Sequence, residues 1–165
     1  MTDNDDPILL LTTGGTIDKL YFDALSEYQI GDTILPRLFA MARVTQPYEV
    51  REILRKDSLE LTDADRAAIA EAVAQAQTSR IVITHGTDTM TITAQALAGI
   101  EGKTVVLVGA LAPARFMESD ATFNLGMAFA TAQIAPPGVY ITMNGTVFRA
   151  DQVVKDRAKG AFVKN

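Results

Sequence analysis

The stretch that decides the fold is Thr84-His85-Gly86-Thr87-Asp88-Thr89. It follows a short apolar run, Arg80-Ile81-Val82-Ile83, which is typical of a buried strand, and it precedes residues 90–97, which are typical of a helix. Small hydroxyl and carboxyl side chains therefore lie on a strand-to-helix turn. In open α/β sheets, ligands bind at this turn, beyond the carboxyl end of the strand. The stretch predicts both a wound sheet and a ligand site at its edge.

The same alternation extends along the chain in both directions. Apolar runs predict further strands at residues 7–13, 48–54, 103–109 and 139–143, and periodic segments predict helices at 32–42, 62–76 and 119–134. Continuous apolarity, as in Ile8 to Leu11, indicates a strand covered on both faces, as in a parallel sheet. We therefore predict a single α/β domain over residues 1–165, a doubly wound, mainly parallel sheet with helices on both faces.

Several local signals refine these bounds. Asp32 is a candidate helix cap, Thr62 to Asp65 resembles a capping box with Asp in place of Glu, and Ser119-Asp120 precedes the next helix. Residues 18–31 show no clean period and are predicted to form a binding loop. The last twenty residues are predicted to hold a short strand followed by an irregular basic tail.

Composition excludes several classes of site and partner. The 165 residues include no cysteine and one histidine, which excludes disulfides, thiolate chemistry and a multi-histidine metal centre. The net charge of −5 argues against nucleic acid as a partner. No apolar run approaches the ~20 residues that span a bilayer. Because the acidic start, residues 1–7, is unlike a signal peptide, we expect a cytoplasmic protein.

Polar groups follow the predicted strand ends at several places. These groups are Thr16, Ser58, Thr87 with Asp88, and the backbone around Ala110. A threonine hydroxyl becomes a nucleophile only when a base or a nearby cation eases the loss of its proton. The backbone amides of the two glycine-rich turns, at Gly14-Gly15 and at Gly86, can stabilise an oxyanion in acyl transfer.

Two long motifs resemble one known family. Thr13-Gly14-Gly15-Thr16-Ile17 and Ile83-Thr84-His85-Gly86-Thr87-Asp88-Thr89-Met90 are similar to the signature motifs of the bacterial-type L-asparaginases, and the likeness extends to Val108-Gly109-Ala110, Asp120 and Phe123-Asn124. It covers nearly the whole chain, but only the N-terminal domain of the usual two-domain enzyme. The chain most resembles the short bacterial forms.

The resemblance implies an acylation site. Thr16 corresponds to the nucleophile that attacks the side-chain amide of L-asparagine and releases ammonia. Tyr21, in the segment after the first motif, corresponds to the tyrosine that assists it. Gly15 lies in the turn that contributes backbone amides, and the backbone carbonyl of Ala110 lines the amide pocket. Neither a metal nor a cofactor is implied.

The resemblance also implies groups for substrate binding and hydrolysis. Thr87, linked to Lys155, corresponds to the residue that assists attack of water on the acyl-enzyme. Asp88 corresponds to the acid that holds the substrate ammonium, and Asp57 with Ser58 to the segment that holds its α-carboxylate. A buried lysine has reason to lower its pKa and act as a base.

Three features depart from the longer relatives. The C-terminal domain, which completes their pocket from a neighbouring subunit, has no counterpart in these residues. Ala112 replaces the arginine that usually precedes the proline at position 113, and Leu59 follows Ser58 where a polar residue is common. These departures bear on affinity and selectivity more than on the type of reaction.

Each candidate residue also has a purely structural interpretation. Thr16 is a candidate turn cap, Asp88 a helix cap, Tyr21 a ring that packs on the core, and Lys155 a solvated tail residue. Ser58 is likewise compatible with a plain turn hydroxyl. No nucleophile-elbow pattern accompanies His85, which favours a structural histidine over a hydrolase base.

The alternatives for function are a related small-amide amidase, an ammonia-supplying component of an amidotransferase, and a module that binds an amino acid without turning it over. For each we expect a small-molecule ligand, no nucleic acid and no membrane. Because longer relatives build their site across subunits, we also expect a homo-oligomer, either a dimer or a tetramer.

Overall fold

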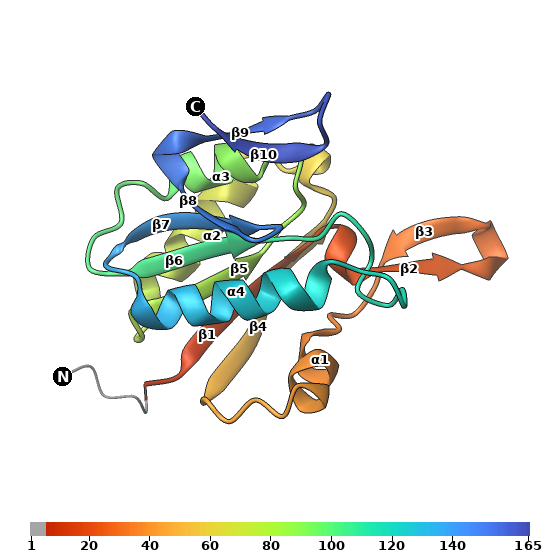
Figure 1. Cartoon of the computed structure of the whole chain (residues 1–165), viewed down its shortest axis with the longest axis horizontal. Coiled ribbons are helices and arrows are strands. Elements are labelled where there is room, and N and C mark those ends of the chain that lie inside the picture. The colour runs from red at the N-terminus through yellow and green to blue at the C-terminus, as the bar shows by residue number, and fades with distance from the viewer. Residues whose placement is uncertain (1–5) are drawn as a thin grey trace.

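The central element of the fold is a six-stranded sheet with the spatial order β4-β1-β5-β6-β7-β8 (Figure 1). This computed structural model describes residues 6–165; residues 1–5, part of the acidic start that supports the expected cytoplasmic location, lie outside the described residues. The strands are β1 Ile8–Gly14, β4 Tyr48–Lys56, β5 Arg80–Thr84, β6 Thr104–Val108, β7 Gly138–Met143 and β8 Thr146–Arg149. The first five are parallel, whereas β8 pairs antiparallel with β7. The predicted, mainly parallel sheet is confirmed.

Helices cover both faces of this sheet, as predicted for a doubly wound fold. Helices α1 (Leu35–Met41) and α4 (Ala121–Ile134) pack on one face, and α2 (Asp63–Gln75) and α3 (Met90–Ala96) pack on the other. Alternate residues of each strand face the two layers: Leu10 and Val82 contact the first pair, Leu11 and Ile83 the second. No helix within residues 6–165 is long and apolar enough to cross a membrane.

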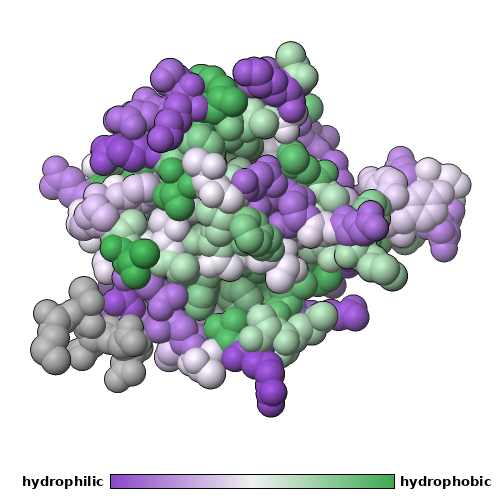
Figure 2. Space-filling view, viewed as in Figure 1, coloured by the Kyte–Doolittle hydropathy of each residue, from purple (hydrophilic) through white to green (hydrophobic). Residues whose placement is uncertain are grey.

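The outer face of α4 is partly apolar. Seen from the side of Figure 1, hydrophobic residues lie between hydrophilic ones over this helix (Figure 2). Phe123 and Ile134 of α4 are 63% and 84% exposed.

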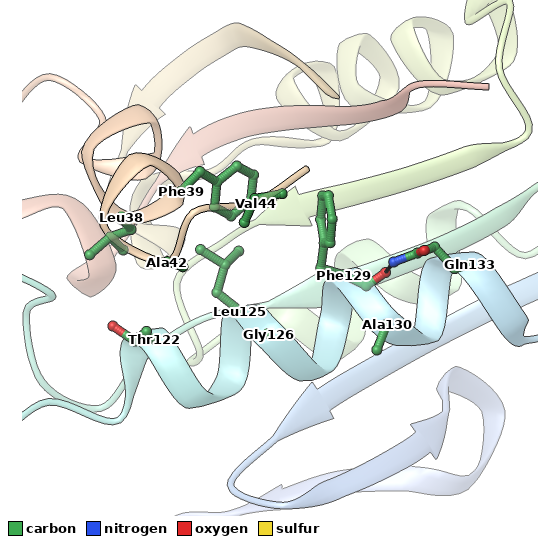
Figure 3. A pocket seen from close by; sticks show the side chains of 10 residues that line it. All are labelled: Leu38, Phe39, Ala42, Val44, Thr122, Leu125, Gly126, Phe129, Ala130 and Gln133. Atoms are coloured by element: carbon green, nitrogen blue, oxygen red, sulfur yellow. Dashed lines mark hydrogen bonds between the residues drawn. The ribbon is translucent and has the colours of Figure 1, made fainter. Parts of the chain in front are cut away.

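A small cavity separates α4 from α1. Figure 3 shows Leu38 and Phe39 of α1 opposite Leu125 and Phe129 of α4. The cavity that these residues line has a volume of about 150 Å³. The rings of Phe39 and Phe129 meet at 5.1 Å in an edge-to-face arrangement. Gly126 lies on this wall, and a Cβ added to it would have no neighbour within 4 Å. The contact between the two helices is therefore incompletely filled.

The capping box at the start of α2 is confirmed. The Thr62 hydroxyl accepts a hydrogen bond from the Asp65 amide at 3.2 Å, and the Asp65 carboxylate accepts one from the Thr62 amide at 2.8 Å. These two bonds satisfy donors that the first turn of a helix leaves free.

Two predictions near the N-terminus are wrong. Asp32 does not cap a helix: α1 begins at Leu35, and the Asp32 side chain is exposed and pairs with Arg55 at 2.8 Å. Residues 18–31 are not an irregular loop, because β2 (Lys19–Phe22) and β3 (Glu27–Ile30) pair as an antiparallel hairpin. This hairpin, residues 19–30, projects from the body of the molecule in Figure 1 and is called the arm below.

The irregular basic tail is also wrong. Strand β8 extends the central sheet, and β9 (Val153–Asp156) pairs antiparallel with β10 (Ala161–Lys164). Val153 and Phe162 are buried in the core layer that contains α2 and α3. The tail is thus a second hairpin held by apolar packing.

Candidate active site

Two glycines bring the turns after β1 and β5 into backbone contact. Gly15 has a φ of +90°, and a Cβ on it would lie 2.5 Å from the amide nitrogen of Gly86. A Cβ on Gly86 would lie 2.7 Å from the Cβ and Oγ atoms of Ser58. Only glycine permits such an approach and such a backbone. The residue before Thr16 therefore touches the residue before Thr87, and Ser58 lies directly against the junction of the two turns.

A third glycine brings in the turn after β6. A Cβ on Gly109 would lie 2.5 Å from the carbonyl oxygen of His85 and 3.2 Å from the Cγ2 atom of Thr87. Ala110, the next residue, is buried. The predicted gathering of Thr16, Ser58, Thr87 and the Ala110 backbone at one sheet edge is therefore present in the structure.

Hydrogen bonds distinguish the threonines at this edge. The Thr13 hydroxyl donates to the Thr84 carbonyl at 2.7 Å, and the Thr89 hydroxyl donates to the Ser58 carbonyl at 2.8 Å. The first bond links the ends of β1 and β5, and the second links the start of α3 to the turn after β4. By contrast, the partly exposed Thr16 side chain makes no hydrogen bond within residues 6–165, and Gly15 rather than Thr16 occupies the N-cap of the following short turn. The Thr16 hydroxyl is therefore available to a ligand.

Lys155 reaches this edge from β9. Its Nζ atom donates to the Thr87 Oγ1 atom at 2.8 Å and pairs with the Asp88 Oδ1 atom at 2.6 Å. The lysine side chain is 16% exposed, so it is not a solvated tail residue. Asp88 does not cap α3, whose N-cap is Thr89. The Lys155 amine thus contacts both the Thr87 hydroxyl and the Asp88 carboxylate.

Asp57 and Ser58 lie beside this group, at the end of β4. The Asp57 carboxylate accepts from the Leu59 amide at 3.1 Å and pairs with Lys19 at 3.1 Å. Burial raises the pKa of Asp57, but the Leu59 amide and the charges of Lys19 and Lys155 outweigh that effect and hold the pKa below its usual range. Asp57 is therefore ionised at neutral pH and already engaged, while Ser58 is buried at the junction.

Tyr21 lies on the arm. Its ring is half-exposed and packs edge-on against Tyr28 at 5.3 Å. No hydrogen bond joins the Tyr21 hydroxyl to Thr16 in the described part of the chain, and the ring does not pack on the core. Of the predicted site residues, Tyr21 is the one that the structure leaves apart from the others.

His85 is a structural residue. It is fully buried, its Nδ1 atom lies 2.6 Å from the Gly86 carbonyl, and its Nε2 atom lies 2.8 Å from the Thr93 hydroxyl. Since a carbonyl only accepts, Nδ1 carries the proton and Nε2 accepts from Thr93. Burial lowers the pKa of His85 to about 4, so the ring is neutral at pH 7.

One network that supports the site was missed by sequence reasoning. Ser119-Asp120 was expected to cap α4: Asp120 occupies the N-cap position, and the Ser119 hydroxyl accepts from the Ala121 amide at 3.1 Å. The Asp120 carboxylate does not bond the helix backbone; it accepts from the amides of Leu111 and Ala112 at 3.0–3.1 Å and from the side chains of Asn124 and Asn144. Asn124 also donates to the Gly109 carbonyl at 3.0 Å. The sequence signal for this network is the pair Asp120 and Asn124, two polar residues four positions apart at the start of an otherwise apolar helix.

Comparison with known proteins gives a family for this arrangement. The family described as "Asparaginase, N-terminal" matches residues 7–162. The chain is 34% identical over 163 residues to the L-asparaginase of Thermococcus kodakarensis, covering 93% of this chain and 48% of that protein. It is 34% identical over 144 residues to one component of the glutamyl-tRNA(Gln) amidotransferase of Pyrobaculum aerophilum, covering 79% of this chain and 33% of that protein.

The fold comparison agrees with the sequence comparison. The solved structure of the thermostable L-asparaginase from Thermococcus kodakarensis superposes with a TM-score of 0.84 at 30% identity, covering 96% of this chain and 51% of that one. The chain therefore spans about half the length of the L-asparaginase of Thermococcus kodakarensis, and about a third of the Pyrobaculum protein.

Proposed function

Because the chain belongs to the asparaginase family, whose N-terminal domain it matches almost throughout, we propose that it hydrolyses L-asparagine to L-aspartate and ammonia through an acyl-threonine. The observation that carries the proposal is the contact of Lys155 with Thr87 beside the unbonded hydroxyl of Thr16. A free hydroxyl can serve as the nucleophile of an acyl transfer, and a second hydroxyl bonded to a lysine amine can pass a proton from water in the step that follows.

In the first step Thr16 attacks. Its Oγ1 atom forms a bond to the amide carbon, the C–N bond breaks, and the threonine proton leaves with the nitrogen as ammonia. The backbone amides at Gly15 and Gly86 stabilise the oxyanion, and the Ala110 carbonyl accepts from the amide nitrogen. Tyr21 assists once the arm moves toward Thr16.

In the second step water cleaves the acyl-threonine. Lys155 acts as the base that takes the proton of Thr87 while Thr87 takes one from water, and the hydroxide attacks the acyl carbon. The bond to the Thr16 oxygen then breaks, and that oxygen takes a proton back from Lys155 through Thr87, which restores both hydroxyls. Asp88 holds the substrate ammonium, and the Asp57-Ser58 segment holds its α-carboxylate, where the Lys19 charge is also available.

The test compares Thr16→Ala with Thr122→Ala, an exposed threonine on α4. Ammonia release from asparagine is expected to fall by about 10³-fold or more in the first variant and to stay unchanged in the second, with equal circular dichroism spectra. In Thr87→Ala, mass spectrometry should detect the aspartyl adduct that the second step no longer clears. Near-normal turnover by Thr16→Ala would refute the nucleophile.

A second candidate is an ammonia-supplying component of an amidotransferase, which the similarity to the Pyrobaculum protein favours. Turnover of free asparagine without a partner protein counts against it. A third, a binding module without turnover, is favoured by the half-length match. Calorimetry with asparagine, run beside the ammonia assay, distinguishes the binding module from the hydrolase. Binding of asparagine without release of ammonia would support the binding module.

A homo-oligomer and a cytoplasmic location complete the proposal. The exposed Phe123 and Ile134 on α4 supply apolar surface for a subunit contact. Light scattering of the purified chain tests whether it forms a homo-oligomer, and fractionation of expressing cells tests whether it is cytoplasmic.

A further inference from the structure

The arm depends on its attachments for its orientation. It is a single two-stranded hairpin, which is marginally stable alone in water. Its large apolar residues are half-exposed: Tyr21, Phe22, Leu25 and Tyr28 range from 42% to 58%. Burial therefore contributes little to holding Tyr21 in place.

Arg115, in the loop between β6 and α4, binds both ends of the arm. Its Nη1 atom donates to the carbonyl of Asp18 at 3.0 Å, and its Nη2 atom donates to the carbonyl of Asp32 at 2.7 Å. Asp18 directly precedes β2, and Asp32 is the second residue after β3. The Gly31 amide donates to the same Asp18 carbonyl at 3.0 Å. One guanidinium thus closes the base of the arm, using the two-pronged geometry that lysine lacks.

The segment that carries Thr16 is fastened to the same loop. The Ala114 amide donates to the Ile17 carbonyl at 3.1 Å. The buried Asp18 carboxylate accepts from the Ile34 amide at 2.9 Å. Burial raises the pKa of Asp18 against the opposing effects of that hydrogen bond and of the Arg115 charge. The loop that carries Arg115 is therefore bonded to residues 17 and 18, next to Thr16, as well as to the arm.

An aromatic contact extends the attachment. Phe116, next to Arg115, meets the ring of Tyr28 at 5.9 Å, and Tyr28 meets Tyr21 at 5.3 Å, both edge-on. The loop after β6 thus holds the arm at its base through Arg115 and along its side through Phe116.

We propose that Arg115 is a positioning residue that fixes the base of the arm, so that the arm moves toward Thr16, and brings Tyr21 with it, from one defined orientation. The functional part of this inference rests on the proposed asparagine hydrolysis. Without Arg115, the arm samples orientations in which Tyr21 is displaced, and the apparent affinity for substrate falls in proportion to the fraction that remains competent. KM should therefore rise by about tenfold in Arg115→Gln, with a smaller change in kcat.

The test combines hydrogen exchange with kinetics. Arg115→Gln is compared with Arg37→Gln, an exposed arginine on α1 that lines the same surface hollow and makes no hydrogen bond in the described part of the chain. Exchange of the amides of residues 19–31 should quicken in Arg115→Gln alone, while peptides from β5 and β6 stay protected. In Arg115→Lys the ammonium group can bond only one of the two carbonyls at a time. The exchange rates of the arm and the KM of this variant should therefore lie between those of the wild type and of Arg115→Gln.

The outcomes separate the inference from the proposed function. Unchanged exchange in the arm of Arg115→Gln overturns the inference, and so does faster exchange with unaltered KM and kcat. Absence of ammonia release by the wild type would refute the proposed hydrolysis, and the exchange comparison would still decide whether Arg115 holds the arm.

Discussion

The Nζ atom of Lys155 lies 2.8 Å from the Oγ1 atom of Thr87, although 68 residues separate the two in the chain. If neutral Lys155 draws the proton from Thr87, Lys155→Met should lower ammonia release by about 10²-fold or more. Lys155→Arg should lose activity too, because a guanidinium does not deprotonate in proteins. Steady-state ammonia assays measure both.

The matched control is Lys159→Met. Lys159 follows the same strand, is 71% exposed and, within residues 6–165, pairs only with Asp156, at 3.4 Å. It should retain wild-type turnover. Equal rates in Lys155→Met and Lys159→Met would contradict the role given to Lys155.

His85 should make the protein sensitive to acid. Its pKa is about 4 when folded and about 6.5 when unfolded. As pH falls from about 6.5 to about 4, His85 is protonated in the unfolded state but stays neutral in the folded state. Protonation therefore favours unfolding, and the free energy of unfolding decreases over this pH range. The loss reaches about 3 kcal/mol.

Urea unfolding at several pH values measures this effect as a difference between the wild type and His85→Gln. The contribution of Asp18, whose pKa shift has the opposite sign, is common to both proteins and cancels in that difference. His85→Gln should show a flatter dependence between pH 6.5 and 4. Parallel curves for the two proteins would show that His85 does not titrate as its burial implies.

Gly126 offers a simple stabilising change. It lies within α4, its surroundings leave room for a Cβ, and it borders the cavity of Figure 3. Gly126→Ala should raise the free energy of unfolding by about 0.5–1 kcal/mol, because alanine restricts the unfolded chain and favours the helix. Chemical denaturation measures it, and a loss of stability would mean that the apparent space is filled.

Gly86→Ala should behave in the opposite way. The new Cβ would approach Ser58 to 2.7 Å, so the turns after β1, β4 and β5 would have to separate. We expect a loss of about 1–3 kcal/mol in stability together with a fall in turnover. An unaltered protein would show that the three turns are not in close contact.

Asp120 should be a stability determinant of the loop that carries Ala110. Asp120→Ala removes the acceptor of two amides and two side chains, and we expect a loss of about 2–3 kcal/mol. The control is Asp151→Ala, which should change stability little, because the Asp151 carboxylate pairs only with exposed Arg149 in the part of the chain that the structure describes. The denaturation midpoints of Asp120→Ala and Asp151→Ala are compared. Similar midpoints would mean that water takes over the hydrogen bonds of Asp120 with no loss of stability.

The sheet was predictable because its strands are short apolar runs buried on both faces, and the α2 cap because Thr62 and Asp65 have the required spacing. The two hairpins were not. The strands of the arm are mostly exposed, and its turn uses Ser26 at a φ of +52° rather than glycine or asparagine, so neither burial nor turn residues identify it. Asp32 is not a cap because α1 begins at Leu35 with Ile34 at its N-cap, and the exposed Asp32 carboxylate pairs with Arg55 instead.

The residues of the candidate site also differ in how well they could be predicted from the sequence. Thr16, Ser58, Thr87 and Asp88 follow predicted strands, so the topology of a parallel sheet places them. Lys155 was named only through the resemblance, because its position depends on how a second hairpin packs on α3 and the core. Arg115 and Lys19 bind partners distant in the chain and have no local signal.

The place of Lys155 on β9 has a consequence for biosynthesis. A ribosome makes the chain from residue 1 onward, so all six strands of the central sheet have been translated before Val153 begins the hairpin that delivers this ammonium group. A nascent chain can therefore assemble its whole scaffold, with Thr87 in place, while the cation beside that hydroxyl is still to be synthesised. The hydrolysis proposed above therefore requires that β9 has been translated and packed beside Thr87.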